Sequence, residues 1–293
     1  MNLFSETLFK NKFNLSKIEQ TVESAIRLAS QNPTTLYLFF QRYTYFNSYV
    51  SSMIPRLTSS IAMSRSLFKD SNALVLEEAD RGMQISTKVM VAAADEGAYG
   101  VSHRSLAQLM LKAVGNYARL STHERNQFSN TPVWLNEIVD TIIATYQGTP
   151  GNIASLIRAM GCHTASEMMG DLEYALLDKI IRYENRGIGF DDYLRNEASP
   201  VTIEGHRYDP WCYVLIHSKH ESSGLEIEHF ESALEALNMV ASYSSEPEQQ
   251  IIEWVLQGFK AFVESQQCLF IEIYHECLEQ LEISQTASLM PAQ

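Results

Sequence analysis

The 293-residue sequence predicts an all-α fold, a bundle of seven or more helices. Apolar residues recur at the spacing of a helix face through most of the chain, and no stretch keeps the period-two alternation of a half-buried strand. Ser16 with Glu19, and Ser245 with Glu248, have the spacing of a capping box, which marks a helix start. Apolar residues make up 45% of the chain and charged residues 19%, so the helices carry enough apolar surface to pack together.

The first helix is expected to begin at Ser16 and to end at Asn32-Pro33, which also opens a second helix over 34–64. That second helix is rich in Tyr and Phe, and Pro55 should kink it or mark a break. Core packing is the simplest role for these rings; lining a substrate pocket or holding a redox-active tyrosine is the alternative. Further helices are expected over 72–99, 105–119, 132–147, 153–183, 211–220, 225–240 and 245–281.

A single helical domain is expected over 1–284, followed by a disordered tail over 285–293. The stretch 185–208 is rich in Gly and Asp and is expected to be one long irregular connection. The segments on either side of it are too few to form separate cores, so one bundle is favoured. Gly161 is a candidate interruption of the long helix in the middle of the chain.

Charge and composition exclude several classes of partner. The net charge of −13 disfavours nucleic acid, because binding it requires a basic surface that neutralises phosphates. No apolar run approaches the length of a membrane span, and the N-terminus has no signal-peptide pattern. The four cysteines are scattered without a C-x-x-C pair, as expected of reduced thiols. We therefore expect a cytoplasmic protein with no nucleic-acid and no membrane partner; homodimerisation is left open.

Glu96 and His103 form the first candidate metal-binding pair. They stand seven residues apart, about two helical turns, so on an uninterrupted helix they share one face. Small residues around them allow neighbouring helices to approach closely. The alternative is a helix end at which Gly97 and Gly100 act as terminators, Glu96 is solvated and His103 caps the next helix.

Glu167 is the second candidate. Its neighbours are small and apolar, and a carboxylate buried among them requires either a positive partner or a metal ion. Asp171 and Glu173 follow closely and are expected to be solvated. His163 is expected to support Glu167 from behind or to lie at the surface.

The third candidate is the stretch 217–229, which is rich in His and Glu. Glu226 and His229 have the i, i+3 spacing that helical bundles use to hold a carboxylate-bridged di-iron centre. His217 or His220, at the end of the preceding helix, could reach the same centre. Mixed imidazole and carboxylate ligands suit iron or manganese, and zinc less specifically.

In their order along the chain, these motifs resemble those of the haem-oxygenase-like diiron oxidases, a family with a TenA-like helical fold. One part of the resemblance is Asp95-Glu96-Gly97 followed by His103-Arg-Ser-Leu-Ala-Gln-Leu-Met. The other parts are a lone Glu after a glycine on a later helix and a His- and acid-rich helix that ends in His. The resemblance covers roughly residues 35–245.

The resemblance implies six iron ligands, among which Glu167 bridges the metals and takes part in catalysis. The ligands it implies are Glu96, His103, Glu167, His220, Glu226 and His229. It further implies two Fe(II) ions per chain, with manganese as an alternative metal. The implied substrates are O2 and a small molecule that is amino-acid-like or fatty-acid-like.

The last of these motifs departs from the family pattern, which usually reads His-x-x-x-Asp/Glu-x-x-His without interruption. The residue seven positions before His229 is Ser222, and His220 comes two residues earlier. On a regular helix His220 would point away from His229, so a break at Gly224 is required to bring it to the centre. His217 is the alternative ligand.

Two other functions are compatible with the sequence. A metal-free enzyme similar to TenA or PQQ synthase would use carboxylates and tyrosines for acid–base chemistry, but it gives the Glu96/His103 and Glu226/His229 pairs no shared purpose. A non-enzymatic helical interaction protein would keep its partner when these four residues are replaced by alanine. Haem oxygenase itself is disfavoured because no His precedes His103, and no phosphate loop or G-x-S-x-G elbow is present.

Overall fold

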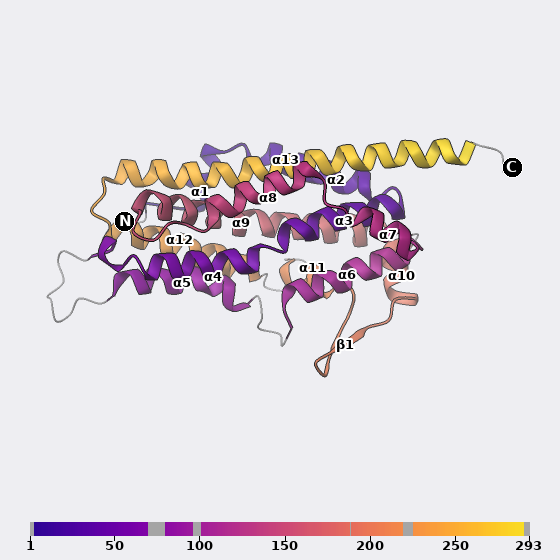
Figure 1. Ribbon diagram of the computed structural model, residues 1–293, viewed down its shortest axis with the longest axis horizontal. Coiled ribbons are helices and arrows are strands. Elements are labelled where there is room, and N and C mark those ends of the chain that lie inside the picture. Colours follow the sequence, from indigo (N-terminus) through magenta and orange to yellow (C-terminus); the bar gives the residue numbers. More distant parts are fainter. Residues whose placement is uncertain (1–2, 70–79, 96–100, 188, 219–224, 290–293) are drawn as a thin grey trace.

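The chain folds as an all-α helical bundle, which confirms the predicted fold class (Figure 1). The structure, a computed structural model, describes residues 3–69, 80–95, 101–187, 189–218 and 225–289. The helices are α1 (Glu6–Lys12), α2 (Leu15–Ala29), α3 (Pro33–Asn47), α4 (Val50–Ala62), α5 (Arg81–Asp95), α6 (His103–Tyr117), α7 (Thr122–Phe128), α8 (Val133–Tyr146), α9 (Ile153–Leu177), α10 (Phe190–Asn196), α11 (Cys212–His217), α12 (Leu225–Tyr243) and α13 (Glu248–Leu289).

Three short elements complete the described fold. A 3₁₀ turn, η1 (Arg65–Leu67), follows α4, and a π-helical segment, η2 (Asp178–Glu184), continues α9. Strands β1 (Val201–Ile203) and β2 (His206–Tyr208) form an antiparallel hairpin. The stretch expected to be irregular, 185–208, therefore contains both α10 and this hairpin.

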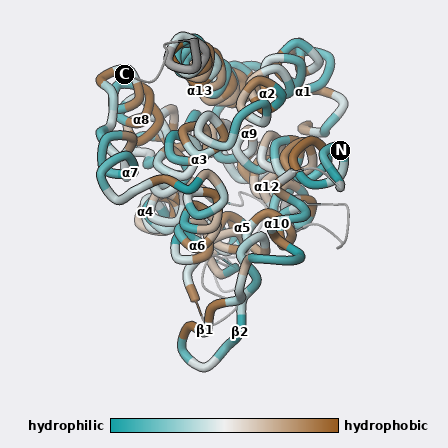
Figure 2. The backbone as a smooth tube through the Cα atoms, turned by 90° about the vertical axis from the view of Figure 1, so that its right-hand side faces the viewer, coloured by the Kyte–Doolittle hydropathy of each residue, from teal (hydrophilic) through white to brown (hydrophobic). Residues whose placement is uncertain are grey.

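Helix α9 runs through the middle of the bundle (Figure 2). It packs against α13, α12, α8, α2 and α4, so neighbours cover it on several sides. A helix enclosed in this way is apolar around most of its circumference. Helix α9 nevertheless carries three buried ionisable groups, His163, Glu167 and Glu173, which need partners inside the protein.

Two glycines allow α9 and α13 to cross closely. A Cβ atom on Gly161 would lie 2.2 Å from the carbonyl oxygen of Val255, and one on Gly258 would lie 1.8 Å from that of Arg158. Both distances are far below van der Waals contact, so each helix needs glycine where the backbone of the other passes. Gly161 is thus a packing residue within a continuous helix, and the interruption considered there is not formed.

The break in the aromatic helical region falls before Pro55. Helix α3 ends at Asn47 and α4 begins at Val50, while Pro55 lies inside α4. Most aromatic residues of α3 are core residues, the simpler of the two predicted roles, while Tyr43 and Phe46 also line a cavity, the alternative role. Those that are buried are Tyr37, Phe39, Phe40, Tyr43 and Phe46.

Both ends of the chain differ from expectation. Helix α2 begins one residue before Ser16, because the Asn14 side chain accepts the backbone N–H of Lys17 and acts as N-cap. Helix α13 continues to Leu289, through residues 285–289 for which a disordered tail was expected. Its C-terminal part projects past the rest of the bundle (Figure 1).

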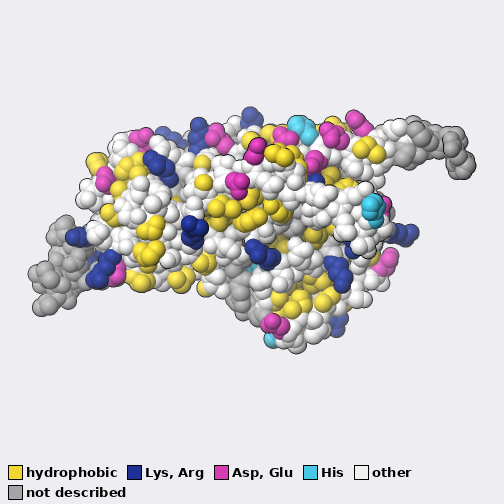
Figure 3. Space-filling model, viewed as in Figure 1, with side chains coloured by type: hydrophobic (Ala, Val, Ile, Leu, Met, Phe, Trp, Pro, Cys, Tyr) yellow, Lys and Arg dark blue, Asp and Glu magenta, His cyan; other side chains and the backbone are white. Residues whose placement is uncertain are grey.

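The surface is mixed in character. On the face in Figure 3, Lys and Arg side chains stand dispersed among acidic and apolar ones. Within the ranges that the structure describes, no helix has the length and apolar character needed to cross a bilayer.

The glycine crossing predicts a large and specific loss of stability. Gly161→Ala should lower the free energy of unfolding by at least about 2 kcal/mol, because the new methyl group meets the backbone of α13 and the helices must separate. Gly82→Ala is the matched control, since a Cβ there meets its neighbours at 3.4 Å, and it should change stability by less than about 1 kcal/mol. Urea unfolding of both variants tests this, and equal losses would contradict it.

Candidate functional site

A cavity of about 70 Å³ lies where α3, α4, α6 and α9 meet the ends of α11 and α12. Five ionisable side chains that line it are each at most 5% exposed. They are His103, Glu167, Glu173, His217 and His229. Such a concentration of buried imidazole and carboxylate groups is costly unless the groups pair with one another or bind an ion.

Glu167 is held through both of its carboxylate oxygens. Oε1 lies 3.2 Å from Nδ1 of His163 and accepts a hydrogen bond of 3.1 Å from the hydroxyl of Ser166. Oε2 lies 3.3 Å from Nδ1 of His229. His163 is almost completely buried and does not line the cavity, so it supports Glu167 from behind.

These contacts belong to a longer chain of polar groups that crosses the bundle. The Tyr146 hydroxyl lies 2.7 Å from Nδ1 of His163, and the carboxylate of Asp95 lies 2.8 Å from Nε2 of His229. Tyr146, Glu167, His229 and Asp95 belong to α8, α9, α12 and α5 respectively. Four helices therefore meet in one hydrogen-bonded arrangement centred on Glu167.

The surroundings of Glu167 decide its charge. Burial by itself raises the pKa of this carboxyl group, but the charges of His163 and His229 and their hydrogen bonds outweigh burial and hold the pKa well below its usual range. Glu167 is therefore a carboxylate at neutral pH. An ionised carboxylate is the form that binds a metal ion.

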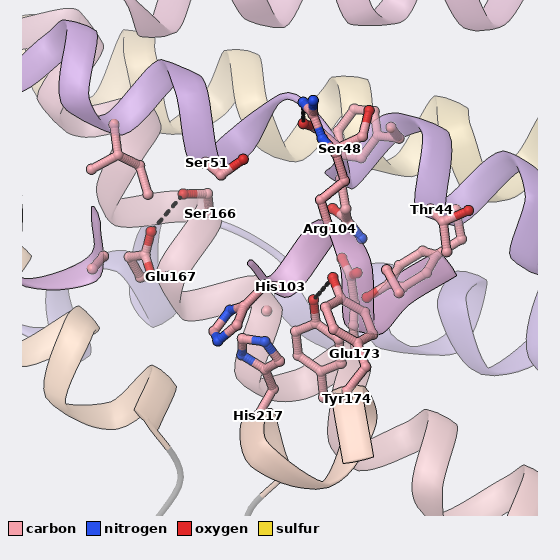
Figure 4. Close-up of a pocket in the computed structure, with 18 of the residues that line it drawn as sticks. Thr44, Ser48, Ser51, His103, Arg104, Ser166, Glu167, Glu173, Tyr174 and His217 are labelled. Carbon is pink, nitrogen blue, oxygen red and sulfur yellow. Dashed lines mark hydrogen bonds between the residues drawn. The ribbon is translucent and has the colours of Figure 1, made fainter. Parts of the chain in front are cut away.

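The second half of the site is aromatic. The rings of His103 and His217 lie 4.7 Å apart, centroid to centroid, and Figure 4 shows them side by side. Tyr174 stacks on His217 at 4.4 Å, and its hydroxyl lies 2.8 Å from that of Tyr213. His103, His217 and Tyr174 thus form an aromatic cluster that lines the cavity together with Glu167.

The structure brings four of the sequence candidates to one cavity. They are His103, Glu167, His229 and the alternative ligand His217. Glu96 and His220 lie outside the described residues. Glu226 lies in the first turn of α12, and its side chain is outside the described part of the chain.

Two expectations about the site are corrected. No helix runs unbroken into His103, because α6 begins there after the N-cap Ser102, whose backbone is extended; Glu96 itself lies outside the described residues. Glu173, which was expected to be solvated, is buried and lines the cavity.

Asp95 was not among the predicted site residues, although its carboxylate contacts His229. Only the meeting of α5 with α12 reveals this role, because the two residues are separated by 134 positions in the sequence. Helix α11 ends at His217, where Ser218 has an extended backbone, and the break expected at Gly224 lies outside the described residues.

Within the described ranges, no three His, Cys, Asp or Glu side chains adopt the geometry of a formed metal site. The ligands at hand are engaged with one another, because Glu167 and His229 form an ion pair. The donor set itself fits iron or manganese, which favour mixed imidazole and carboxylate ligation. The residues present therefore match the chemistry of the metal. To bind it, Glu167 and His229 would have to give up their contact with each other.

Comparison with known proteins supports the fold. No family model and no curated protein sequence matches the chain. A crystal structure of a CADD-like protein of unknown function from Nostoc punctiforme superposes with a TM-score of 0.53. The superposition covers 90% of this chain and 96% of that protein, at 16% sequence identity. At this identity the similarity establishes a shared fold, and function must be argued from the site.

The polar network around Glu167 predicts how stability responds to the loss of one hydroxyl group. Tyr146→Phe should lower the free energy of unfolding by about 1–2 kcal/mol, because the fully buried Nδ1 of His163 loses its 2.7 Å contact. Tyr45→Phe is the control: its hydroxyl bonds to Asn136 at an exposed position, and the change should be within about 0.5 kcal/mol. Denaturant unfolding of the metal-free protein measures both, and a neutral Tyr146→Phe would show that the network does not need this hydroxyl.

Proposed function

We propose that the protein is a non-haem diiron oxidase or oxygenase that activates O2 to oxidise a small molecule. The observation that carries the proposal is the convergence of His103, Glu167 and His229 from three helices on one cavity. The sequence pattern alone also predicts each of these three residues as a metal ligand. The shared fold with a CADD-like protein is consistent with the proposal and does not by itself indicate an activity.

We propose six ligands for two Fe(II) ions, with manganese as an alternative metal. Four of them line the cavity, and the side chains of the other two lie outside the part of the chain that the structure describes. His103, Glu167 and His229 line the cavity, and His217 stands beside His103. Glu96 and Glu226 complete the proposed set. Bound Fe(II) supplies the electrons for O2 reduction, which protein side chains of this kind do not provide.

The residues behind the ligands orient them. His163 and Ser166 hold Oε1 of Glu167, so the carboxylate cannot turn freely. Asp95 occupies Nε2 of His229 and leaves Nδ1 directed at Glu167, where a metal would bind. Partners of this kind fix the ring orientation of a ligand histidine and increase its basicity.

The walls of the cavity limit access of water to the reacting groups. Phe46, Ile54 and Phe262 line it and are each at most 5% exposed. Tyr174 and Tyr213 bond to each other, so their hydroxyl groups are held at fixed positions beside His217. A cavity that excludes bulk water protects a reactive oxidising site from side reactions.

Metal analysis tests the proposal directly. After anaerobic reconstitution with Fe(II) and desalting, the protein should retain about two iron ions per chain, as carboxylate-bridged bundle sites do. The double variant Glu167→Ala/His229→Ala should lose this iron. The control His275→Ala removes an exposed imidazole on α13 and should keep it.

Oxygen consumption by the reconstituted protein completes the test. Uptake of O2 that depends on bound iron supports an oxidase or oxygenase. Absence of stoichiometric metal in both wild type and His275→Ala would overturn the proposal and favour a metal-free enzyme of the same fold.

The choice between His217 and His220 is a separate prediction. We expect His217 to be the ligand, because it is buried, lines the cavity and contacts the His103 ring. His217→Ala should therefore lower the retained iron to about half, since an incomplete coordination shell holds its metal weakly. His220→Ala should leave it unchanged, and the opposite pattern would identify His220 as the ligand.

A further inference from the structure

The cavity contains a second group of polar side chains, which the proposed metal site does not use. Arg104, Asn47 and Gln266 line the same space as His103 and Glu167. They come from α6, the end of α3 and the middle of α13. Uncharged hydroxyl groups of Thr44 and Ser51 stand with them.

Arg104 is a cation at the mouth of the cavity. It follows His103 directly in the first turn of α6, and its side chain is exposed, while one guanidinium nitrogen donates to the backbone carbonyl of Ser48. Figure 4 shows the guanidinium group beside Ser48. No acidic side chain in the described ranges pairs with Arg104, so most of its donors remain available for an anion.

Gln266 is buried inside the cavity with an unused acceptor. It is 1% exposed, and within the described part of the chain no donor reaches its Oε1 atom. It lies one turn from Phe262, whose ring is 6.4 Å from that of Phe46. Gln266 and Asn47, the last residue of α3, line the same cavity.

Asn47 offers the complementary group at that end of α3. Its Nδ2 atom is buried, and no acceptor among the described residues reaches it. An unpaired buried donor and an unpaired buried acceptor each destabilise the empty protein, so both are expected to have a partner when the cavity is filled. The partner must therefore offer an acceptor to Asn47, a donor to Gln266 and a negative charge to Arg104.

We propose that the cavity binds a small α-amino acid as the substrate of the proposed oxidase. Its carboxylate pairs with Arg104 and accepts from Asn47, and its ammonium group donates to Gln266. The inference rests on the proposed function in one respect, that the bound molecule is the one oxidised.

Charge and size agree with this ligand class. Arg104 places a positive charge at the mouth, where it can pair with the carboxylate of a ligand. A cavity of about 70 Å³ suits a small molecule.

The test measures binding of the common L-amino acids, one at a time, by calorimetry on the anaerobic Fe(II)-loaded protein. For the tightest binder, the amino-acid amide and the des-amino acid are measured as well. We expect both analogues to bind at least about tenfold more weakly, because each leaves a buried or charged protein group without its partner.

Variants link the binding to the named residues. Arg104→Gln should weaken binding of the amino acid by at least about tenfold and abolish the preference over its amide. Gln266→Leu should abolish the preference over the des-amino acid. The controls Arg56→Gln and Gln267→Leu replace the same residue types outside the cavity and should bind as wild type does.

The outcomes separate this inference from the diiron proposal, because iron content is measured on the same samples. Binding that depends on Arg104 and Gln266 in protein without stoichiometric iron would support the subsite and overturn the diiron function. Iron-loaded protein that binds no amino acid, or binds it equally well in both cavity variants, would overturn the subsite and leave the diiron proposal standing.

Discussion

The carboxylate of Glu167 is ionised and lies inside the bundle, where a charge without partners would strongly favour unfolding. Two imidazoles compensate it, one on each oxygen, and these are in turn held by Tyr146 and Asp95. The partners come from three other helices besides α9. The positions of α5, α8 and α12 around α9 are therefore constrained by one charge, and the cavity arises where their packing leaves room beside it.

Much of the fold could be predicted from local rules. Helical periodicity and the scarcity of strand patterns indicated an all-α bundle, and the small, apolar neighbours of Glu167 indicated a buried carboxylate that needs a partner. The positions of the helix breaks were harder to predict from the sequence. Pro55 lies inside α4, and the chain breaks before it at Ser48 and Tyr49.

The parts of the site that the sequence did not reveal depend on tertiary contacts. Asp95 and His229 meet because α5 packs against α12, and no spacing rule connects residues so far apart. Glu173 looked solvated because acidic residues usually are. It is buried because α9 is enclosed by other helices. Asn47 and Gln266 have ordinary local surroundings, and only their shared cavity distinguishes them from other amide side chains.

The crossing of α9 and α13 has a consequence for recognising related proteins. Gly161 accommodates Val255 and Gly258 accommodates Arg158 through backbone atoms, so the identities of the facing side chains are free to change while both glycines are retained. Relatives that have diverged beyond detectable overall similarity should keep this pair of glycines together with Glu167, six residues after Gly161 on the same helix. A search for that joint pattern would find them through shared geometry, where comparison of whole sequences does not.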